Sequence, residues 1–290
     1  MTRVRAFAKI NLSLRVIGVL AGGAHELRTI FQSIALYDTL TIRRRRGPFW
    51  IVCDDPACPA DSTNLVWRAA EAVWTASGRP GSPRDVGVTL TKQIPIGAGL
   101  GGGSSDAAAA LRAFAKMWQV NAKRLPDLAA SLGADVPYFL EGGTVLGLGR
   151  GDALYPLIDR PRSWVTLVVP SFGVSTRDAY GWFDEDAAKP PAGLDRAWPD
   201  RRGLREAQND LEPAVAKRHP EITQIVTGLR GAGASYAAMT GSGSTVFGLF
   251  DRRPAAARAA KSLGRRERAL SNIIITRTLT RTECRRLAAK

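Results

Sequence analysis

A glycine-rich stretch that leads directly into an alanine run limits what this chain can fold into. Residues 95 to 111 read PIGAGLGGGSSDAAAAL, and five of the eleven residues from Pro95 to Ser105 are glycine. A loop that leads into a helix presents backbone N–H groups and the positive end of the helix dipole to an anion. Glycines permit positive φ angles and lack the Cβ atoms that would keep a ligand away from the backbone. The stretch therefore predicts a phosphate-binding loop and a helix from about Ser104 to Trp118.

The loop does not match the commoner phosphate-binding motifs. Gly97, Gly99 and Gly102 fit the spacing G-x-G-x-x-G, but residues 112 to 124 hold no acidic residue to bind a ribose. A P-loop needs a lysine inside the glycine motif, and this stretch has none. The H-R-D and D-F-G motifs of protein kinases do not occur. Phosphate binding is thus predicted without a Rossmann sheet or a P-loop.

The charge of the chain favours anionic partners. Lys and Arg outnumber Asp and Glu by 41 to 26, a net charge of +15, which attracts nucleic acids or phosphorylated small molecules. Neither an aromatic RNA-binding motif nor zinc-finger spacing is present, so no nucleic acid is expected as a partner. The run RRRR at Arg43–Arg46 follows a strand-like stretch and is interpreted as an exposed turn.

Composition excludes several other classes of protein. Three cysteines and two histidines in 290 residues do not suit a disulfide scaffold or a structural zinc site. No G-x-S-x-G elbow indicates a serine hydrolase. No apolar run is long enough to span a bilayer, and the alternating N-terminus lacks the apolar core of a signal peptide. We expect a cytoplasmic protein that does not contact a membrane.

Hydrophobic periodicity predicts an α+β fold of two units, residues 1–153 and 154–290. Runs of strands and helices follow one another without strict β-α-β alternation. In the first unit the patterns predict strands at 3–17, 29–46 and 86–94, and helices at 62–77, 104–118 and 121–133. Residues 134–152 are expected to lead back to a glycine-rich strand and turn. Ser62 or Thr63 is the expected N-cap of the helix at 62–77. In the second unit they predict strands at 163–171 and 272–279, a strand–turn–strand at 235–250, and helices at 175–183, 204–217, 220–230 and 253–264. Residues 184–203, rich in proline and glycine, are expected to form a mobile loop.

Three motifs in order along the chain resemble those of the GHMP kinases. They are AKINLSLRVIG near the N-terminus, the glycine-rich loop, and MTGSGSTVFGLF near the C-terminus. This resemblance covers nearly the whole chain. It implies an N-terminal ribosomal-protein-S5-like α/β domain that binds ATP, a C-terminal ferredoxin-like α+β domain, and Mg²⁺ as the metal.

Further segments resemble one branch of that family. They are GGAHELRTIFQSI, NLVWRAA, LGADVPYFLEGGTVLGLGRGD and PSFGVSTRDAY. This branch phosphorylates the 2-hydroxyl of a cytidine diphospho-methylerythritol in the non-mevalonate isoprenoid precursor pathway. The resemblance therefore implies a small-molecule kinase with an alcohol acceptor. We expect it to be a monomer or weak homodimer.

The resemblance assigns catalysis to Lys9 and Asp135. Asp135 would act as general base on the acceptor hydroxyl, and Lys9 would position it and favour the reacting alkoxide. From the residues alone, Asp135 could equally be a helix cap and Lys9 a solvent-facing strand residue. Asn11 has the same parity as Lys9 on a strand, so both side chains should face one side; the resemblance places Asn11 at the substrate.

The remaining site residues also follow from the resemblance. His25 would hydrogen-bond the cytosine and Tyr180 would stack on it. Asn64, Leu65 and Lys92 would surround the adenine, although Asn64 could instead cap a helix and Lys92 could face solvent. The ATP phosphates would bind the loop, which comprises Pro95, Ile96, Gly97, Ala98, Gly99, Leu100, Gly101, Gly102, Gly103, Ser104 and Ser105. Ser105 is the candidate metal ligand, and Asp106 is interpreted as favouring the helix N-terminus.

One departure from the family pattern concerns the cytosine site. The family has G-Y-H where this chain has Gly23-Ala24-His25, and alanine cannot stack on a base. Base–aromatic stacking is worth about 1–3 kcal/mol. We therefore expect weaker nucleotide binding, or a replacement ring such as Phe31.

Two alternatives remain at this point. Another GHMP-type kinase would act on homoserine, mevalonate or a sugar. A basic nucleic-acid-binding protein with a purely structural glycine loop would show salt-dependent binding to DNA or RNA and no ATP turnover.

Overall fold

Two sheets, joined by a shared core, organise the molecule. The computed structural model describes residues 1–187, 208–266 and 270–288. The first sheet has six strands in the order β3-β4-β2-β5-β6, and β1 pairs with β2. Its strands are β1 (Thr2–Val19), β2 (His25–Pro48), β3 (Trp50–Cys53), β4 (Arg84–Thr91), β5 (Thr144–Gly149) and β6 (Ala153–Pro156). The second sheet is antiparallel in the order β10-β7-β9-β8, with β7 (Trp164–Pro170), β8 (Tyr236–Met239), β9 (Val246–Phe250) and β10 (Leu270–Arg277).

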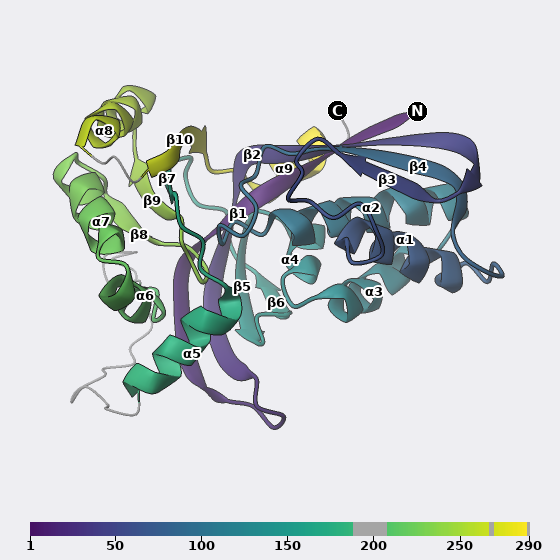
Figure 1. Cartoon of the computed structure of the whole chain (residues 1–290), viewed down its shortest axis with the longest axis horizontal. Helices are drawn as coiled ribbons and strands as arrows, with labels where there is room; N and C mark the ends of the chain where they lie inside the picture. Colours follow the sequence, from purple (N-terminus) through teal and green to yellow (C-terminus); the bar gives the residue numbers. More distant parts are fainter. Residues whose placement is uncertain (188–207, 267–269, 289–290) are drawn as a thin grey trace.

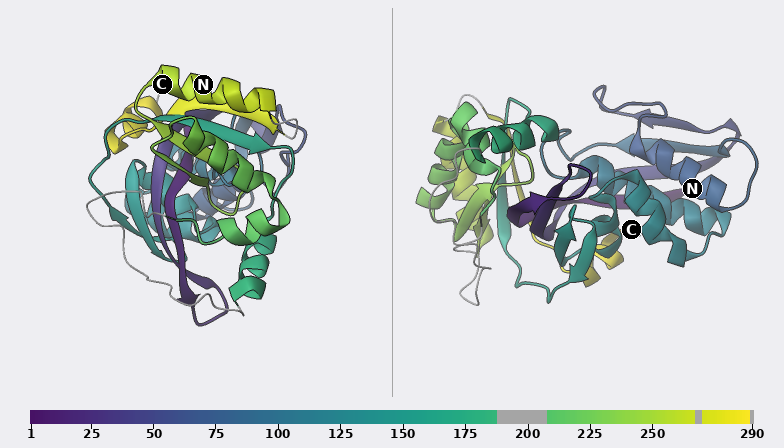
Figure 2. Two further views of the ribbon diagram at one scale, coloured as in Figure 1. Left: turned by 90° about the vertical axis from the view of Figure 1, so that its left-hand side faces the viewer. Right: turned by 90° about the horizontal axis from the view of Figure 1, so that it is seen from below.

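Helices pack against both sheets, as Figures 1 and 2 show. Those of the first unit are α1 (Leu65–Ala76), α2 (Gly102–Trp118), α3 (Leu125–Leu132) after the short 3₁₀ turn η1 (Ala122–Arg124), and α4 (Val136–Glu141). Those that follow are α5 (Thr176–Ala187), α6 (Glu212–Arg218), α7 (Glu221–Gly231), α8 (Arg253–Arg266) and α9 (Arg281–Ala288). Apolar faces of α1, α2 and α3 form one core with the first sheet, and α6, α7 and α8 form another with the second.

A third core cluster joins the two halves of the chain. Ile10 and Leu12 of β1, together with Leu100 of the glycine-rich loop, belong to the same buried cluster as Val165, Leu167 and Phe247 of the second sheet. Burial of these side chains fixes the loop against both sheets, because removing them from water contributes about 25 cal/mol per Å² of apolar area. The loop is therefore placed by the packing of both halves.

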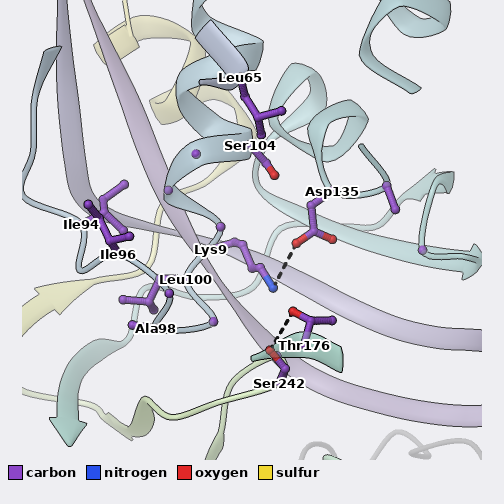
Figure 3. A pocket seen from close by; sticks show the side chains of 18 of the residues that line it. Lys9, Leu65, Ile94, Ile96, Ala98, Leu100, Ser104, Asp135, Thr176 and Ser242 are labelled. Carbon is purple, nitrogen blue, oxygen red and sulfur yellow. Dashed lines mark hydrogen bonds and ion pairs between the residues drawn. The ribbon is translucent and has the colours of Figure 1, made fainter. Parts of the chain in front are cut away.

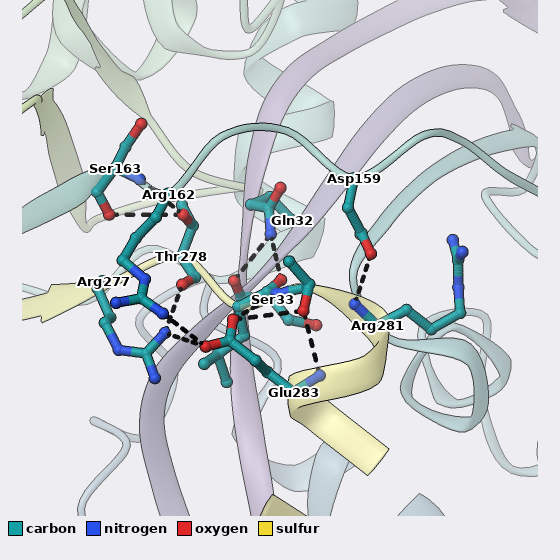
Figure 4. A network of polar contacts seen from close by, with 11 residues as sticks. Gln32, Ser33, Asp159, Arg162, Ser163, Arg277, Thr278, Arg281 and Glu283 are labelled. Carbon is teal, nitrogen blue, oxygen red and sulfur yellow. Dashed lines mark hydrogen bonds and ion pairs between the residues drawn. The ribbon is translucent and has the colours of Figure 1, made fainter. Parts of the chain in front are cut away.

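The C-terminal segment returns to the first sheet through a network of polar contacts (Figure 4). Glu283 at the start of α9 accepts hydrogen bonds from Arg162 and Arg277, each at 2.9 Å. Asp159 accepts from the backbone N–H of Arg281 at 2.9 Å. Gln32 of β2 donates to the carbonyl of Leu279 at 2.8 Å, and α9 packs on β1. The last helix thus completes the N-terminal half of the molecule.

Several local predictions need correction. The N-cap of α1 is Asn64, whose Oδ1 accepts from the N–H of Val66 at 2.8 Å, and not Ser62 or Thr63. Arg43–Arg46 do not form a turn, because β2 continues through them. The short strands β3 and β6 and the helices α4 and α9 were not predicted.

The segment expected to be a mobile loop, residues 184–203, is described only at its start. Residues 184–187 belong to α5, and residues 188–203 lie outside the described part of the chain. The chain leaves the first sheet at Pro156 and enters the second at Trp164. The division between residues 153 and 154 stays a prediction.

Candidate active site

A cavity of about 740 Å³ opens beside the glycine-rich loop (Figure 3). Its walls come from β1, from the loop between β4 and α2, from the start of α4, and from the turn between β8 and β9. Lys9, Asn11 and Asp135 line it together with the loop residues Pro95–Ser104. The cavity therefore brings together residues that the sequence had singled out in segments far apart along the chain.

Two glycines show why the loop has this composition. Gly97 has φ +69° and nothing within 4 Å of the place where a Cβ would lie, so its backbone faces open space. Gly99 has φ +75°, and a Cβ there would come within 2.4 Å of the carbonyl oxygen of Thr240. Positive φ angles are strained for residues with a side chain. One glycine thus exposes the backbone to a ligand, and the other lets the loop pack against the C-terminal motif.

The start of α2 leaves donors available to an anion. Its N-cap residue is Gly101, with φ +72°, and no side chain caps the helix. The N–H groups in the first turn of a helix have no acceptor within the helix. The positive end of the helix dipole adds to them, so an anion in the cavity meets both.

The two serines of the loop differ in orientation. Ser104 lines the cavity, and its hydroxyl points toward the side where Asp135 lies (Figure 3). Ser105 is 2% exposed, and its hydroxyl donates to the carbonyl of Phe7 at 2.7 Å. That hydroxyl holds α2 against β1 and Ser105 does not line the cavity, so its assignment to the metal or the nucleotide stays a prediction.

Lys9 and Asp135 meet across the cavity, at what we call the transfer end. The Lys9 ammonium lies 3.4 Å from Oδ2 of Asp135 and donates to Oδ1 of Asn11 at 2.8 Å. The prediction that Lys9 and Asn11 face one side of β1 is confirmed. An ammonium has three N–H donors, so one remains for a bound ligand. The Asn11 amide in turn donates to the Thr29 hydroxyl at 2.8 Å, which fixes its orientation.

Asp135 does not serve as a helix cap. It precedes α4, but its carboxylate makes no capping hydrogen bond, and Pro137 has no N–H to offer. The side chain of Asp135 is 37% exposed, whereas that of Lys9 is only 5% exposed. A buried cation thus faces a carboxylate that stays accessible to a substrate.

A second lysine forms what we call the loop anchor, made of Lys92, Asp38 and Asp106. The Lys92 ammonium donates to the Asp38 carboxylate and to Oδ2 of Asp106, the latter at 2.7 Å. Oδ1 of Asp38 accepts from the backbone N–H groups of Gln93 and Ile94 at 2.6 and 2.8 Å. Since these residues lie just before the loop and Asp106 lies just after it, the anchor holds both ends of the loop.

Burial sets the protonation of the loop anchor. All three side chains are at most 6% exposed. Burial raises the pKa of the Asp106 carboxyl to about 8, against the opposing effect of Lys92. Burial alone would lower the pKa of Lys92, but Asp106 and Asp38 together raise it above its usual value. Lys92 lines the cavity and is therefore not the solvent-facing residue of the alternative interpretation.

Asn64 and Leu65 lie at the cavity wall near Cys58. Both polar groups of the Asn64 side chain have protein partners: Oδ1 caps α1, and Nδ2 donates to the carbonyl of Pro59 at 2.6 Å. The structural interpretation of Asn64 as a cap is therefore confirmed. The cap leaves Oδ1 of Asn64 with a second lone pair for a ligand, because an amide oxygen can accept two hydrogen bonds.

His25 and Tyr180 come together at the other end of the cavity. Their rings stack with centroids 4.6 Å apart and planes 29° apart. Nε2 of His25 lies 2.8 Å from Oδ1 of Asp184 on α5. Burial raises the pKa of the Tyr180 hydroxyl above its usual value. The sequence resemblance assigned both residues to the cytosine of the substrate, and in the structure their rings contact each other.

Phe31 cannot serve as the replacement for the missing tyrosine. Its side chain is 2% exposed, and its ring packs on Tyr138 with centroids 4.7 Å apart. The Lys9 ammonium lies 5.5 Å from the ring centroid. A base would find no free face on this ring.

Four residues at or beside the site were not assigned from the sequence. The Thr240 hydroxyl accepts from the N–H of Asn11 at 2.9 Å, and the Ser242 and Thr176 hydroxyls lie 3.2 Å apart at the cavity wall. The motif MTGSGS had been singled out, but none of its residues had been given a role. The role of Asp38 could not be predicted from the sequence, because the position of a single aspartate in a strand does not reveal which residues its side chain contacts.

Comparisons with known proteins agree with this geometry. The model for the GHMP kinases N terminal domain matches residues 64–143, and the model for the GHMP kinases C terminal domain matches residues 199–269. The chain is 40% identical over 287 residues to a 4-diphosphocytidyl-2-C-methyl-D-erythritol kinase of Moorella thermoacetica, covering 94% of this chain and 98% of that relative. The chain belongs to the 4-diphosphocytidyl-2-C-methyl-D-erythritol kinase family of GHMP kinases.

Further similarities support the family. A 4-diphosphocytidyl-2-C-methyl-D-erythritol kinase of Solibacter usitatus is 42% identical, with 90% of this chain and 85% of the relative covered. The crystal structure of a 4-(cytidine 5'-diphospho)-2C-methyl-D-erythritol kinase superposes with a TM-score of 0.78 at 32% identity, covering 95% and 98% of the two chains. A mevalonate kinase from L. major, with a TM-score of 0.71 at 17% identity and coverage of 97% and 96%, shares the fold.

These findings confirm the two-domain α+β fold of the GHMP kinases and an ATP-dependent small-molecule kinase. Members of the family use ATP as the phosphate donor. Among the described residues, no helix is long and apolar enough to cross a membrane.

Proposed function

We propose that this kinase phosphorylates the 2-hydroxyl of 4-diphosphocytidyl-2-C-methyl-D-erythritol with ATP. The observation that carries the proposal is the Lys9–Asp135 pair, 3.4 Å apart and beside the phosphate loop. Phosphoryl transfer needs positioning and charge stabilisation more than covalent chemistry. The relatives' names supply the substrate, and the transfer end supplies the groups that the reaction requires.

In this proposal Asp135 takes the proton of the acceptor hydroxyl. The carboxylate has no capping duty and is partly exposed, so a hydroxyl can reach it. Lys9, held by Asn11, places its ammonium group beside the oxygen that becomes the nucleophile. Donors fixed before the reaction stabilise developing charge without reorganising.

The phosphates of ATP bind the loop in this proposal. The N–H groups at the start of α2 and the open backbone at Gly97 receive the anionic oxygens. The loop anchor keeps both ends of the loop in place while they do so. Leu65, Asn64 and Lys92 form the wall against which the adenine lies.

The residues beside the loop fit Mg²⁺. Mg²⁺ takes one or two protein oxygens and completes its coordination with phosphates and water. The Ser104 hydroxyl lines the cavity, and Oδ1 of Asp106 is buried without a hydrogen-bond partner. These two residues would hold the ion, which supplies positive charge to the transferring phosphate.

His25, Tyr180 and Asn11 bind the substrate in this proposal. The stacked His25–Tyr180 pair offers one aromatic wall to the cytosine, in place of the sandwich that Ala24 cannot complete.

Coupled measurement of ADP release tests the proposal. We expect turnover with the cytidine diphospho substrate, and kcat/KM at least about 10²-fold lower with homoserine or mevalonate. Faster turnover of homoserine or mevalonate would show that the protein is a kinase but that the proposed substrate is wrong. Salt-dependent DNA or RNA binding without ADP release from any of the three would overturn the kinase assignment.

A further inference from the structure

A second cavity, of about 1230 Å³, lies on the opposite side of the first turn of α2 from the active site. Its walls come from the start of β1, from β2, from the middle of α2, and from α9. Figure 1 shows α9 beside the strands of the first sheet. No described residue lines both cavities. Nothing in the proposed reaction uses this second cavity.

The second cavity is strongly cationic. Seven of its lining residues are cationic, and none of them lines the active-site cavity: Arg3, Arg5, Arg43, Arg44, Arg112, Lys116 and Arg285. None of the described residues that line it is an aspartate or a glutamate. Two of the cations belong to the arginine run that the kinase function leaves without a role.

Most of these cations lack acidic partners. In the described ranges, no carboxylate pairs with Arg3, Arg43, Arg44 or Lys116. Arg285 reaches Glu141 at 3.7 Å, a distant contact at an exposed site. By contrast, the lysines of the active-site cavity each face carboxylates. A surface that leaves like charges together without counter-charges favours binding of an anion.

Two of the guanidinium groups lie close to one another. Burial, and then the nearby charge of Arg285, lower the pKa of Arg112 below its usual value. The Arg112 guanidinium donates to the carbonyl of Leu140, so it is held in place at the cavity wall. An anion placed between Arg112 and Arg285 would relieve their repulsion. Planar guanidinium groups bind phosphates through paired hydrogen bonds.

The interior of the second cavity is apolar. Partly or fully buried side chains form it, namely Val4, Phe7, Ala113, Met117, Phe139 and Cys284. A polyanion such as DNA would contact only a rim of cations and leave these groups in water. Of the large apolar side chains that are exposed among the described residues, only Met1 lies at this cavity. A membrane surface would need several protruding anchors, because its apolar layer must be penetrated.

We propose that the second cavity binds a small phosphorylated amphiphile, with an apolar body on the cavity floor and a phosphate head among the arginines. Charge complementarity selects the head, and burial of the apolar body adds affinity in proportion to its area. The site is separate from the kinase reaction, so its occupancy can be measured without turnover.

Calorimetric titration with n-octyl phosphate tests the proposal. The titration is done with saturating ADP, which keeps the probe from the phosphate loop. We expect saturable binding of one molecule per chain. Octanol and inorganic phosphate each lack one half of the recognised chemistry, so we expect them to bind at least about tenfold more weakly.

A matched pair of variants locates the binding. R43E/R44E reverses two charges at the cavity, and R45E/R46E reverses two neighbouring charges that do not line it. We expect the first variant to raise the Kd for octyl phosphate at least about tenfold and the second to change it less than about threefold. Thermal melts check that both variants fold.

Three outcomes would overturn the proposal. The first is no saturable binding of octyl phosphate to the wild type. The second is an equal loss of affinity in the two variants, which would show general charge attraction. The third is binding of duplex DNA or anionic vesicles that depends on Arg43 and Arg44 while octyl phosphate does not bind, which would assign the surface to a macromolecule or a membrane.

Discussion

Lys9 and Lys92 line one cavity, but the transfer end and the loop anchor surround them differently. Lys9 faces Asp135, whose carboxylate is 37% exposed and carries no other duty in the fold. Lys92 faces Asp38 and Asp106, which are both buried and which hold the backbone on either side of the phosphate loop. A lysine paired with aspartate thus suits catalysis at the transfer end, where the aspartate is accessible. At the loop anchor, where the lysine and both aspartates are buried, the same pairing stabilises the structure. Substitutions at the two lysine sites should separate these roles.

We expect the largest effect from Lys92→Met, on the free energy of unfolding. Removing the cation leaves the buried Asp38 carboxylate without a counter-charge beside Asp106, which costs about 3–5 kcal/mol of unfolding free energy. Urea unfolding of Lys92→Met and of the exposed control Lys123→Met measures it. The triple variant K92M/D38N/D106N should regain more than half of the loss, because no unpaired charge remains. Equal stability of Lys92→Met and Lys123→Met would show that the anchor does not stabilise the fold.

We expect the second-largest effect from Asp135→Asn at the transfer end, on kcat. The amide cannot take a proton, so we expect kcat to fall at least about 10²-fold while KM changes less than about threefold. The unfolding free energy should change by less than about 1 kcal/mol, because the side chain is partly exposed and caps nothing. Asp127→Asn, at an exposed position on α3, is the matched control. Near-normal kcat in a folded Asp135→Asn variant would remove Asp135 from the reaction.

The smallest effect concerns the pH dependence of the loop anchor. Burial raises the pKa of Asp106 to about 8 in the folded protein, against about 4 when unfolded. Between these values the native state binds more protons than the unfolded state, so its stability falls as pH rises. Asp106→Asn cannot titrate and lacks this slope. We expect its unfolding free energy, relative to wild type, to rise by up to about 2 kcal/mol from about pH 6 to about pH 8. Parallel pH profiles would contradict the raised pKa.

The sequence went furthest where one local segment carries the chemistry. The glycine density of residues 95–105 predicted a phosphate loop before α2, and the open backbone at Gly97 agrees with it. Parity placed Lys9 and Asn11 on one side of β1, and their 2.8 Å hydrogen bond confirms it. The motifs predicted the family, which the relatives bear out.

Which member of a local pair faces the site was decided only by packing. Ser104 and Ser105 are equivalent in sequence, but the carbonyl of Phe7 takes the hydroxyl of Ser105. Phe31 was a plausible ring for the base until its burial against Tyr138 removed its free face. Hydrophobic periodicity predicts on which face of a helix or strand a side chain lies, but it does not predict which residue that side chain contacts.

The sequence by itself thus determined the loop, the helix that follows it, the family and the residue types of the reaction. Only the tertiary structure decided that Asp38 fastens the loop, that Asp135 meets Lys9 rather than capping α4, and that Arg43 and Arg44 border a second cavity. The physical reason is range: glycine conformations and strand parity act over a few residues, whereas ion pairs and cavities depend on segments that burial of the shared core brings together.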